Sequence, residues 1–217
     1  EYALALMQGA ALPAGEQQAI AAKLSRYTGL SESYIQKTNL RIEIFRFTKE
    51  LLRDRGLTIG RLDARFTGID KDTAGEKFEY DPSSAATQGP FTAVLNDYMR
   101  RDLGFANDLS YEILAKLYEN WSFDQFENQF VDVAETLRQA MSINPHLKVL
   151  VANGYYDLAT PYLATRYTFN HLGLDPSLHA NITMTFYEAG HMMYIHLPSL
   201  AQLKEDLAQF VETAVPN

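Results

Sequence analysis

The chain has no cysteine and no excess of basic residues. The absence of cysteine among the 217 residues excludes thiol catalysis, disulfide bonds and thiolate metal sites. Asp and Glu number 27 against 19 Lys and Arg, which gives a formal net charge of −8. A surface that binds nucleic acid needs clustered Lys and Arg to neutralise phosphates. We therefore expect no nucleic-acid partner.

The sequence also has no long apolar run, and its first residues do not have the pattern of a signal peptide. No run approaches the roughly 18 apolar residues that a membrane-spanning helix requires, so we expect no membrane partner. The chain opens with Glu1 instead of Met and without a charged-then-apolar pattern, which predicts a processed or trimmed product. Apolar residues still make up 47% of the chain. That is enough to bury a substantial core in one good-sized domain or two small ones.

Residues 1–125 are predicted to form a mainly helical cap or lid region. Apolar residues recur at helical spacing up to about residue 56. Residues 57–67 alternate as an irregular strand does, and 68–90 hold glycine and proline but few aliphatic residues, which predicts a long surface loop. A helix is expected again from 91 to 103.

A further amphipathic helix is predicted over 126–141, with one apolar face made of Phe126, Phe130, Val133, Leu137 and Met141.

Residues 126–217 are predicted to form an α/β segment. The near-continuous apolar run 147–152 is typical of a strand buried on both faces of a parallel sheet, and 182–187 is predicted as a second strand. A helix over 160–172 is expected to be capped by Thr160, with Pro161 at its first position. The closing helix, 200–211, is expected to turn one apolar side inward: Leu200, Leu203, Leu207, Phe210 and Val211.

Two parallel strands are too few for an independently stable sheet, which usually needs three or more. The remaining residues offer at most one or two further strand candidates. We therefore expect the missing strands to come from an upstream portion of the same protein, from a second chain or from self-association.

The candidate catalytic residues follow the two predicted strands. Asp157 follows the first strand in the segment NGYYD, and His191 follows the second in the segment EAGH. Because carboxyl ends of parallel strands meet at one sheet edge, a carboxylate there could orient the imidazole and leave its Nε2 to accept a proton. The alternatives are that Asp157 caps the next helix and that His191 is an ordinary loop histidine. The spacing of Glu188 and His191 suits a metal site when both residues lie on a helix, but here they are predicted on a strand-to-loop segment, where their side chains diverge. We therefore expect no metal and no other cofactor.

The segment 149–161 (VLVANGYYDLATP), followed by 187–192 (YEAGHM), resembles the C-terminal part of serine carboxypeptidases, in their bacterial, cysteine-poor branch. The segments 27–31 (YTGLS) and 61–68 (RLDARFTG) resemble the cap region of that family. The resemblance implies a partial α/β-hydrolase fold with a mainly helical cap. It implies that Asp157 is the triad acid and His191 the triad base.

The resemblance places Met192 on the leaving-residue side of a peptide-binding cleft. Tyr155 and Tyr156 are candidate substrate-binding residues, with core packing as the alternative for all three. The family's Gly-Glu-Ser-Tyr nucleophile elbow is absent from the sequence. The chain is therefore expected to start after the nucleophile and to be inactive alone.

The expected function is that of a serine carboxypeptidase, which cleaves C-terminal residues from peptides through an acyl-enzyme. The expected location is periplasmic or extracellular. One alternative is a non-catalytic binding or assembly module on a hydrolase scaffold. The other is an esterase or lyase of the same superfamily.

Overall fold

The computed structural model describes residues 1–109, 111–113 and 115–215. It is a mixed α/β structure in which helices account for 54% and strands for 8%, so the expected α/β class is confirmed at this level, without a specific fold. Contacts divide the chain into two units. The first comprises Glu1–Ala85 and Tyr156–Ala159, and the second comprises Ala86–Tyr155 and Thr160–Asn217.

The first unit packs four short helices and a small hairpin. Its helices are α1 (Tyr2–Gln8), α2 (Ala14–Thr28), α3 (Glu32–Lys37) and α4 (Ile44–Glu50), and its antiparallel strands are β1 (Thr58–Ile59) and β2 (Thr67–Gly68). The helical prediction for this stretch is confirmed. Apolar side chains of the helices bury one another, with Ala21 and Ile35 fully enclosed. Ser31 begins α3, because its Oγ accepts the Tyr34 N–H at 3.1 Å.

The loop predicted over 68–90 is wrong in its second half, where α5 (Pro82–Asp97) begins. Asp81 precedes the helix, and its carboxylate accepts the Ser83 N–H at 2.9 Å. A proline at the first helical position suits this start, because the missing N–H would have no partner there. The Asp-Pro pair therefore marks a helix start. A π-helical turn, Tyr98–Asp102, follows α5.

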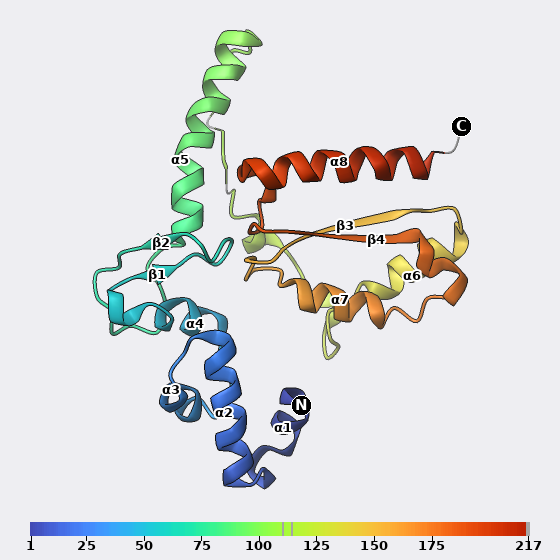
Figure 1. Ribbon diagram of the computed structural model, residues 1–217. Coiled ribbons are helices and arrows are strands. Elements are labelled where there is room, and N and C mark those ends of the chain that lie inside the picture. The colour runs from blue at the N-terminus through green and yellow to red at the C-terminus, as the bar shows by residue number, and fades with distance from the viewer. Residues whose placement is uncertain (110, 114, 216–217) are drawn as a thin grey trace. The chain divides into compact units, whose positions relative to one another are not determined.

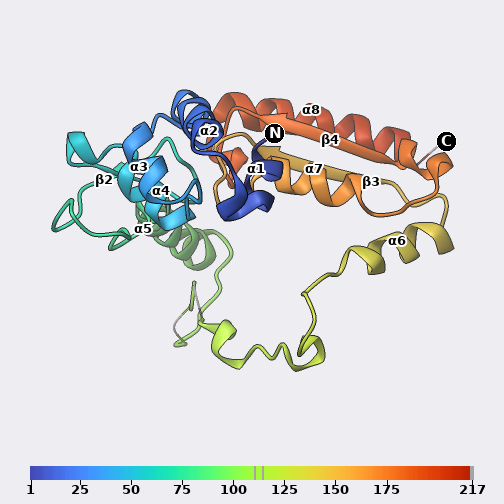
Figure 2. The same ribbon diagram turned by 90° about the horizontal axis from the view of Figure 1, so that it is seen from below.

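The second unit contains the α/β segment. Strands β3 (Val149–Gly154) and β4 (Ile182–Tyr187) pair in parallel, with Val149 opposite Ile182 and Gly154 opposite Tyr187. The strand prediction and the parallel arrangement are confirmed. Helices α6 (Ala134–Ile143), α7 (Tyr162–Asn170) and α8 (Leu197–Ala214) belong to the same unit. Figures 1 and 2 show α7 and α8 on opposite faces of the strand pair.

Each face of the strand pair has its own small core. Met141 of α6 is fully buried with Leu172 and Leu174, and Val149 and Ile182 pack against this cluster. On the side of α8, Tyr187 and Met193 are buried with Leu203 of that helix packed against them. The two cores explain why β3 and β4 hold together although they form only a two-stranded sheet.

The predicted helix over 126–141 is wrong in its first half. The helix α6 starts only at Ala134, whose N–H bonds to the Asp132 carboxylate at 2.8 Å. Asn128 has a left-handed backbone with φ of 59°, which no α-helix accommodates. Phe130 is 98% exposed, so its expected place in an apolar face is not supported by packing.

Burial along β3 and α8 is lower than predicted. Val149, Leu150 and Val151 are only half-buried and Ala152 is exposed, although the run was expected to be covered on both faces. On α8, Leu203 and Phe210 are half-buried as inward side chains. In contrast, the other three side chains expected inward are exposed: Leu200, Leu207 and Val211. A sheet of two strands is too narrow to cover the whole apolar side of an 18-residue helix.

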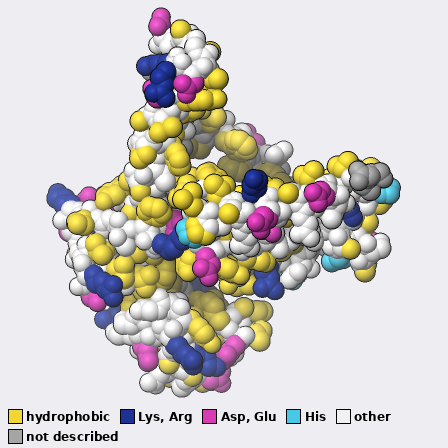
Figure 3. Space-filling model, turned by 45° about the horizontal axis from the view of Figure 1, so that its top comes forward, with side chains coloured by type: hydrophobic (Ala, Val, Ile, Leu, Met, Phe, Trp, Pro, Cys, Tyr) yellow, Lys and Arg dark blue, Asp and Glu magenta, His cyan; other side chains and the backbone are white. Residues whose placement is uncertain are grey.

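Exposed apolar side chains also occur along α5, where Phe91, Val94 and Leu95 follow one another at helical spacing. Figure 3 shows hydrophobic side chains spread over the face in view, those of α5 among them. Among the residues that the structure describes, no helix combines the length and hydropathy needed to cross a membrane.

Candidate functional site

The two strands of the second unit end at the same edge. The paired residues Gly154 and Tyr187 are the last of β3 and β4, and the Tyr155 N–H continues the pairing by donating to the Tyr187 carbonyl at 3.0 Å. The chain reaches Asp157 three residues after β3 and His191 four residues after β4. Such carboxyl edges are where ligands bind in open α/β sheets.

The loop that carries His191 packs directly against the end of β3. A Cβ added at Gly154 would lie 2.2 Å from the Gly190 carbonyl oxygen and 2.5 Å from that of Ala189. Only glycine allows two backbones to approach this closely. Gly154 is therefore required by the close approach of the end of β3 and the loop of His191.

His191 is exposed, and its ring makes a side-chain contact that sequence reasoning missed. Its Nδ1 lies 3.2 Å from the Thr160 Oγ1. The expected role of Thr160 as a helix cap is wrong, because α7 begins after Pro161 and no side chain caps it. A threonine before a proline has a restricted backbone, and its hydroxyl here faces the imidazole. The sequence signal at this position is a Thr-Pro pair after a strand, which on local pattern alone predicts a helix cap.

Asp157 is 5% exposed and lies in a turn that belongs to the first unit. Its Oδ1 accepts the Ala159 N–H at 2.8 Å. Backbone bonds hold the turn on both sides of the aspartate. The Leu158 N–H donates to the Arg61 carbonyl at 3.0 Å, and the Ala64 N–H donates to the Tyr156 carbonyl at 3.0 Å. The structure thus orders the turn of Asp157 in one unit and the loop of His191 in the other, and their pairing is part of the proposal below.

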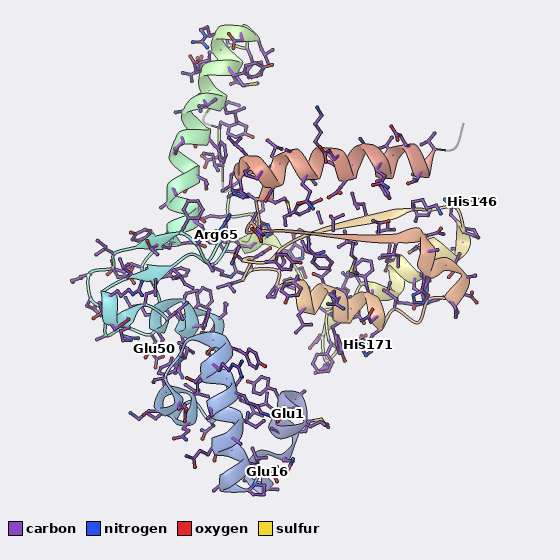
Figure 4. The ribbon with its side chains drawn as sticks, in the orientation of Figure 1. Glu1, Glu16, Glu50, Arg65, His146 and His171 are labelled. Atoms are coloured by element: carbon purple, nitrogen blue, oxygen red, sulfur yellow. The ribbon has the colours of Figure 1, made fainter. Side chains whose placement is uncertain are left out.

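Tyr156, a candidate substrate-binding residue, lies in the same turn as Asp157. The Arg65 guanidinium lies 5.1 Å from the centre of the Tyr156 ring. Arg65, labelled in Figure 4, also bonds the buried Asp63 through two nitrogens, at 3.0 and 2.7 Å. The 61–65 segment therefore fixes both the backbone and the ring of Tyr156.

The other two candidate substrate-binding residues lie in the second unit. The Tyr155 ring is stacked on Phe186 of β4 at 5.8 Å and meets the edge of Tyr162 of α7 at 5.4 Å, yet 47% of Tyr155 is exposed. Met192 is half-buried beside His191, while its neighbour Met193 is buried in the core under β4. The exposed part of the Tyr155 ring provides a surface that an apolar ligand could contact.

Tyr187 anchors the end of β4. Its side chain is fully buried, and its hydroxyl donates to the Asp206 carboxylate of α8 at 2.7 Å. Burial raises the pKa of Tyr187 to about 12, and the hydrogen bond to Asp206 acts in the same direction. Asn153 is buried next to it, and its amide donates to the carbonyls of Val151 and Thr185 at 3.2 Å each. These bonds fix the strand ends from which both loops leave.

Within the part of the chain that the structure describes, no group of three or more His, Asp or Glu side chains could hold a metal ion. Figure 4 shows two further histidines of the second unit away from the carboxyl edge. His146 precedes β3, and His171 follows α7 with its Nδ1 2.7 Å from the Tyr167 carbonyl. Of these three histidines, His191 is the one that follows the carboxyl end of a strand, one residue after a glycine.

Comparison of the chain with protein-family models, with curated proteins and with solved structures finds no match.

Proposed function

We propose that the chain supplies the acid and the base of a serine carboxypeptidase-like hydrolase. The observation that carries this proposal is the close backbone contact of Gly154 with Ala189 and Gly190 at the shared end of two parallel strands. It brings the loop of the base, His191, to the end of the strand that leads to the acid, Asp157. An acid and a histidine after successive strands follow the chain order Ser, Asp, His of α/β-hydrolases.

In the proposed reaction a serine from sequence outside these 217 residues attacks the carbonyl of the C-terminal peptide bond. His191 Nε2 accepts the serine proton and then gives it to the departing amine, which leaves an acyl-enzyme. Water then attacks the acyl-enzyme: His191 Nε2 accepts a proton from the water and gives it to the serine oxygen, which releases the acid product and the free serine. Asp157 stabilises the imidazolium that forms twice in this cycle. Tyr155, Tyr156 and Met192 are proposed to contact the peptide, and no cofactor is required.

The proposed partner is the portion of the protein that carries the serine, or a second copy of the chain. The two-stranded sheet and the exposed apolar side chains of α8 support this part of the proposal, because a parallel sheet is normally covered on both faces and continued at its edges. The proposed location is periplasmic or extracellular.

A fluorophosphonate probe tests the proposal, because it modifies only an activated serine. The purified 217-residue chain should neither react with the probe nor hydrolyse blocked dipeptides, since it contains no nucleophile elbow. The full-length gene product should do both, and His191→Ala should abolish the activity. His146→Ala is the matched control, because that exposed histidine precedes β3 and should be dispensable. Labelling of the 217-residue chain, or a full-length protein that does not label, would contradict the proposal.

The absence of a nucleophile elbow favours one other class, a binding or assembly module that keeps a hydrolase scaffold without its chemistry. A full-length protein that lacks a reactive serine but binds peptides would support this class. An esterase or lyase would label with the probe and would be separated by its substrate profile.

A further inference from the structure

We propose that Asp81 is a positioning residue for Asp157: its carboxylate anchors the hairpin loop, residues 60–66 between β1 and β2, and this loop holds the turn of Asp157. The catalytic meaning of this role rests on the proposed function, whereas the structural link does not. The observation is a chain of hydrogen bonds within the first unit, from the Asp81 carboxylate to the hairpin loop and from the loop to the turn.

The two carboxylate oxygens of Asp81 face different segments. Oδ1 accepts the Ser83 N–H at 2.9 Å and also the Ser83 hydroxyl, at the start of α5. Oδ2 accepts the N–H groups of Arg61 and Leu62 at 3.3 Å each, and the Arg61 N–H lies equally far from Oδ1. A charged acceptor thus satisfies two successive backbone donors of the loop. The carboxylate therefore joins the hairpin loop to the start of α5.

The hairpin loop also packs directly on the start of α5. A Cβ added at Gly60 would lie 2.8 Å from the Ser83 side chain and 2.6 Å from the Asp63 carbonyl oxygen. The loop is closed by its own backbone bonds, because the Gly60 N–H donates to the Phe66 carbonyl at 2.9 Å and the Phe66 N–H donates to the Asp63 carbonyl at 3.1 Å. A shift of the anchored end is therefore passed on to the rest of the loop.

The other side of the hairpin loop bonds the backbone on both sides of Asp157. The Arg61 carbonyl accepts the Leu158 N–H at 3.0 Å, and the Ala64 N–H donates to the Tyr156 carbonyl at 3.0 Å. Asp157 between them is 5% exposed. The turn therefore depends on the loop for its place.

Arg61 takes part in both sets of bonds, through its N–H to Asp81 and through its carbonyl to Leu158. One residue thus connects the anchor with the neighbour of the proposed triad acid. A carboxylate orients an imidazole only within a narrow geometry, and a misplacement of about 1 Å can cost about 100-fold in rate. We therefore expect Asp81 to affect catalysis through Asp157, without contact with the substrate.

Hydrogen exchange in the 217-residue chain tests the link without any activity, with the Leu158 and Ala64 amides as reporters. Asp81→Asn keeps one oxygen, and asparagine caps helices as well as aspartate does. The oxygen should stay with the Ser83 N–H, so that the amide NH₂ opposes the two N–H groups of the loop. We expect the protection of both reporters to fall by about tenfold or more, because a charged acceptor is lost.

The chain offers a matched control in a second Asp-Pro-Ser segment, 175–177. The Asp175 carboxylate accepts the Ser177 N–H at 2.9 Å and the Ser177 hydroxyl at 2.6 Å, and Asp175→Asn should leave both reporters unchanged. The Ile35 N–H bonds the Ser31 carbonyl at 3.1 Å in the buried core of the first unit. Its protection measures the stability of that unit and should not change in Asp81→Asn.

Asp81→Ser is a second variant, which keeps a capping oxygen and places no donor against the hairpin loop. It should also lower the protection of the Leu158 and Ala64 amides, and it decides the question if the asparagine variant does not fold. Unchanged protection of both reporters would overturn the proposal. An equal loss at the Ile35 amide would also overturn it, because Asp81 would then stabilise the unit as a whole.

In the full-length protein, Asp81→Asn should lower kcat by roughly ten- to hundredfold with little change in KM. The acid limb of the kcat/KM profile should move to lower pH, because an imidazolium that is stabilised less well loses its proton more readily. A fall in activity with an unmoved profile would contradict the positioning of Asp157. If exchange depends on Asp81 while the full-length protein does not label with the fluorophosphonate, the link stands and the hydrolase proposal fails. If the protein labels and exchange does not depend on Asp81, the reverse holds.

Discussion

At the residue scale, Tyr187 links the end of β4 to α8 and thereby supports the loop of His191. Its hydroxyl is buried and donates to Asp206, and its pKa is raised to about 12. Ionisation in the unfolded chain begins near pH 10, the ordinary range for tyrosine. Between pH 10 and pH 12 the native state holds a proton that the unfolded state has released, so the free energy of unfolding must fall as pH rises.

We therefore expect the free energy of unfolding of the second unit to decrease from pH 10 toward pH 12, with the contribution of Tyr187 fully present below pH 10. Urea unfolding monitored across this range measures the slope. Tyr187→Phe should lower stability at neutral pH by about 1 kcal/mol, the typical net value of one hydrogen bond. It should also reduce the decrease at high pH. Tyr167→Phe, at an exposed site on α7, is the control. Equal slopes for Tyr187→Phe and the original chain would contradict the prediction.

The elements differ in how well the sequence predicted them. The strands β3 and β4 follow from short β-rich apolar runs, because a run of six residues is a local feature of the sequence. The segment 126–133 has the same kind of apolar spacing as α6, yet α6 begins only at Ala134, whose N–H donates to the Asp132 carboxylate, and Phe130 is 98% exposed. Periodicity reports which side chains could share a face, whereas packing decides whether that face has a partner.

The candidate site likewise has parts that the sequence predicts and a part that only the tertiary structure shows. Asp157 and His191 could be placed after their strands from the sequence, because strand ends and glycine turns are local features. The contact of Thr160 with His191 could not, since it joins residues 31 positions apart through the pairing of β3 with β4. Thr160 before a proline satisfied the local pattern of a helix cap, and only the tertiary arrangement shows that its hydroxyl is used elsewhere.

The contact between the end of β3 and the loop of His191 gives a prediction about Gly154. Alanine at this position would place its Cβ 2.2 Å from the Gly190 carbonyl oxygen, so the loop of His191 must move. We expect a loss of about 1–3 kcal/mol, the usual cost of forced overpacking. Urea unfolding should show this loss, and ¹H–¹⁵N spectra should show shifts centred on 189–193.

The control is Gly15→Ala within α2, where an added Cβ meets nothing within 4 Å. It should be neutral or stabilise by about 0.5–1 kcal/mol, because alanine is the better helix former. If Gly154→Ala is as well tolerated as Gly15→Ala, the end of β3 and the loop of His191 are not in contact.

At the scale of the whole molecule, the second unit has more apolar surface than its two strands can cover. Leu200, Leu207 and Val211 are exposed on α8, and Ala152 is exposed on β3. Exposed apolar side chains that gather into one patch are typical of interaction surfaces on soluble proteins. The net charge of −8 opposes non-specific association. The partner proposed above would cover this exposed surface.

We expect the isolated chain to associate with itself or to retain an upstream portion of the protein. Light scattering over a range of concentrations should show a mass above 24.5 kDa, or intact mass analysis should show a bound fragment. Leu207→Glu places a charge in the apolar patch of α8 and should shift the protein toward the monomer. Gln209→Glu adds the same charge at a polar, exposed position of that helix and should not. A compact, stable monomer at every concentration, with no fragment bound, would show that two strands and their helices suffice, which would remove the structural reason for expecting a partner.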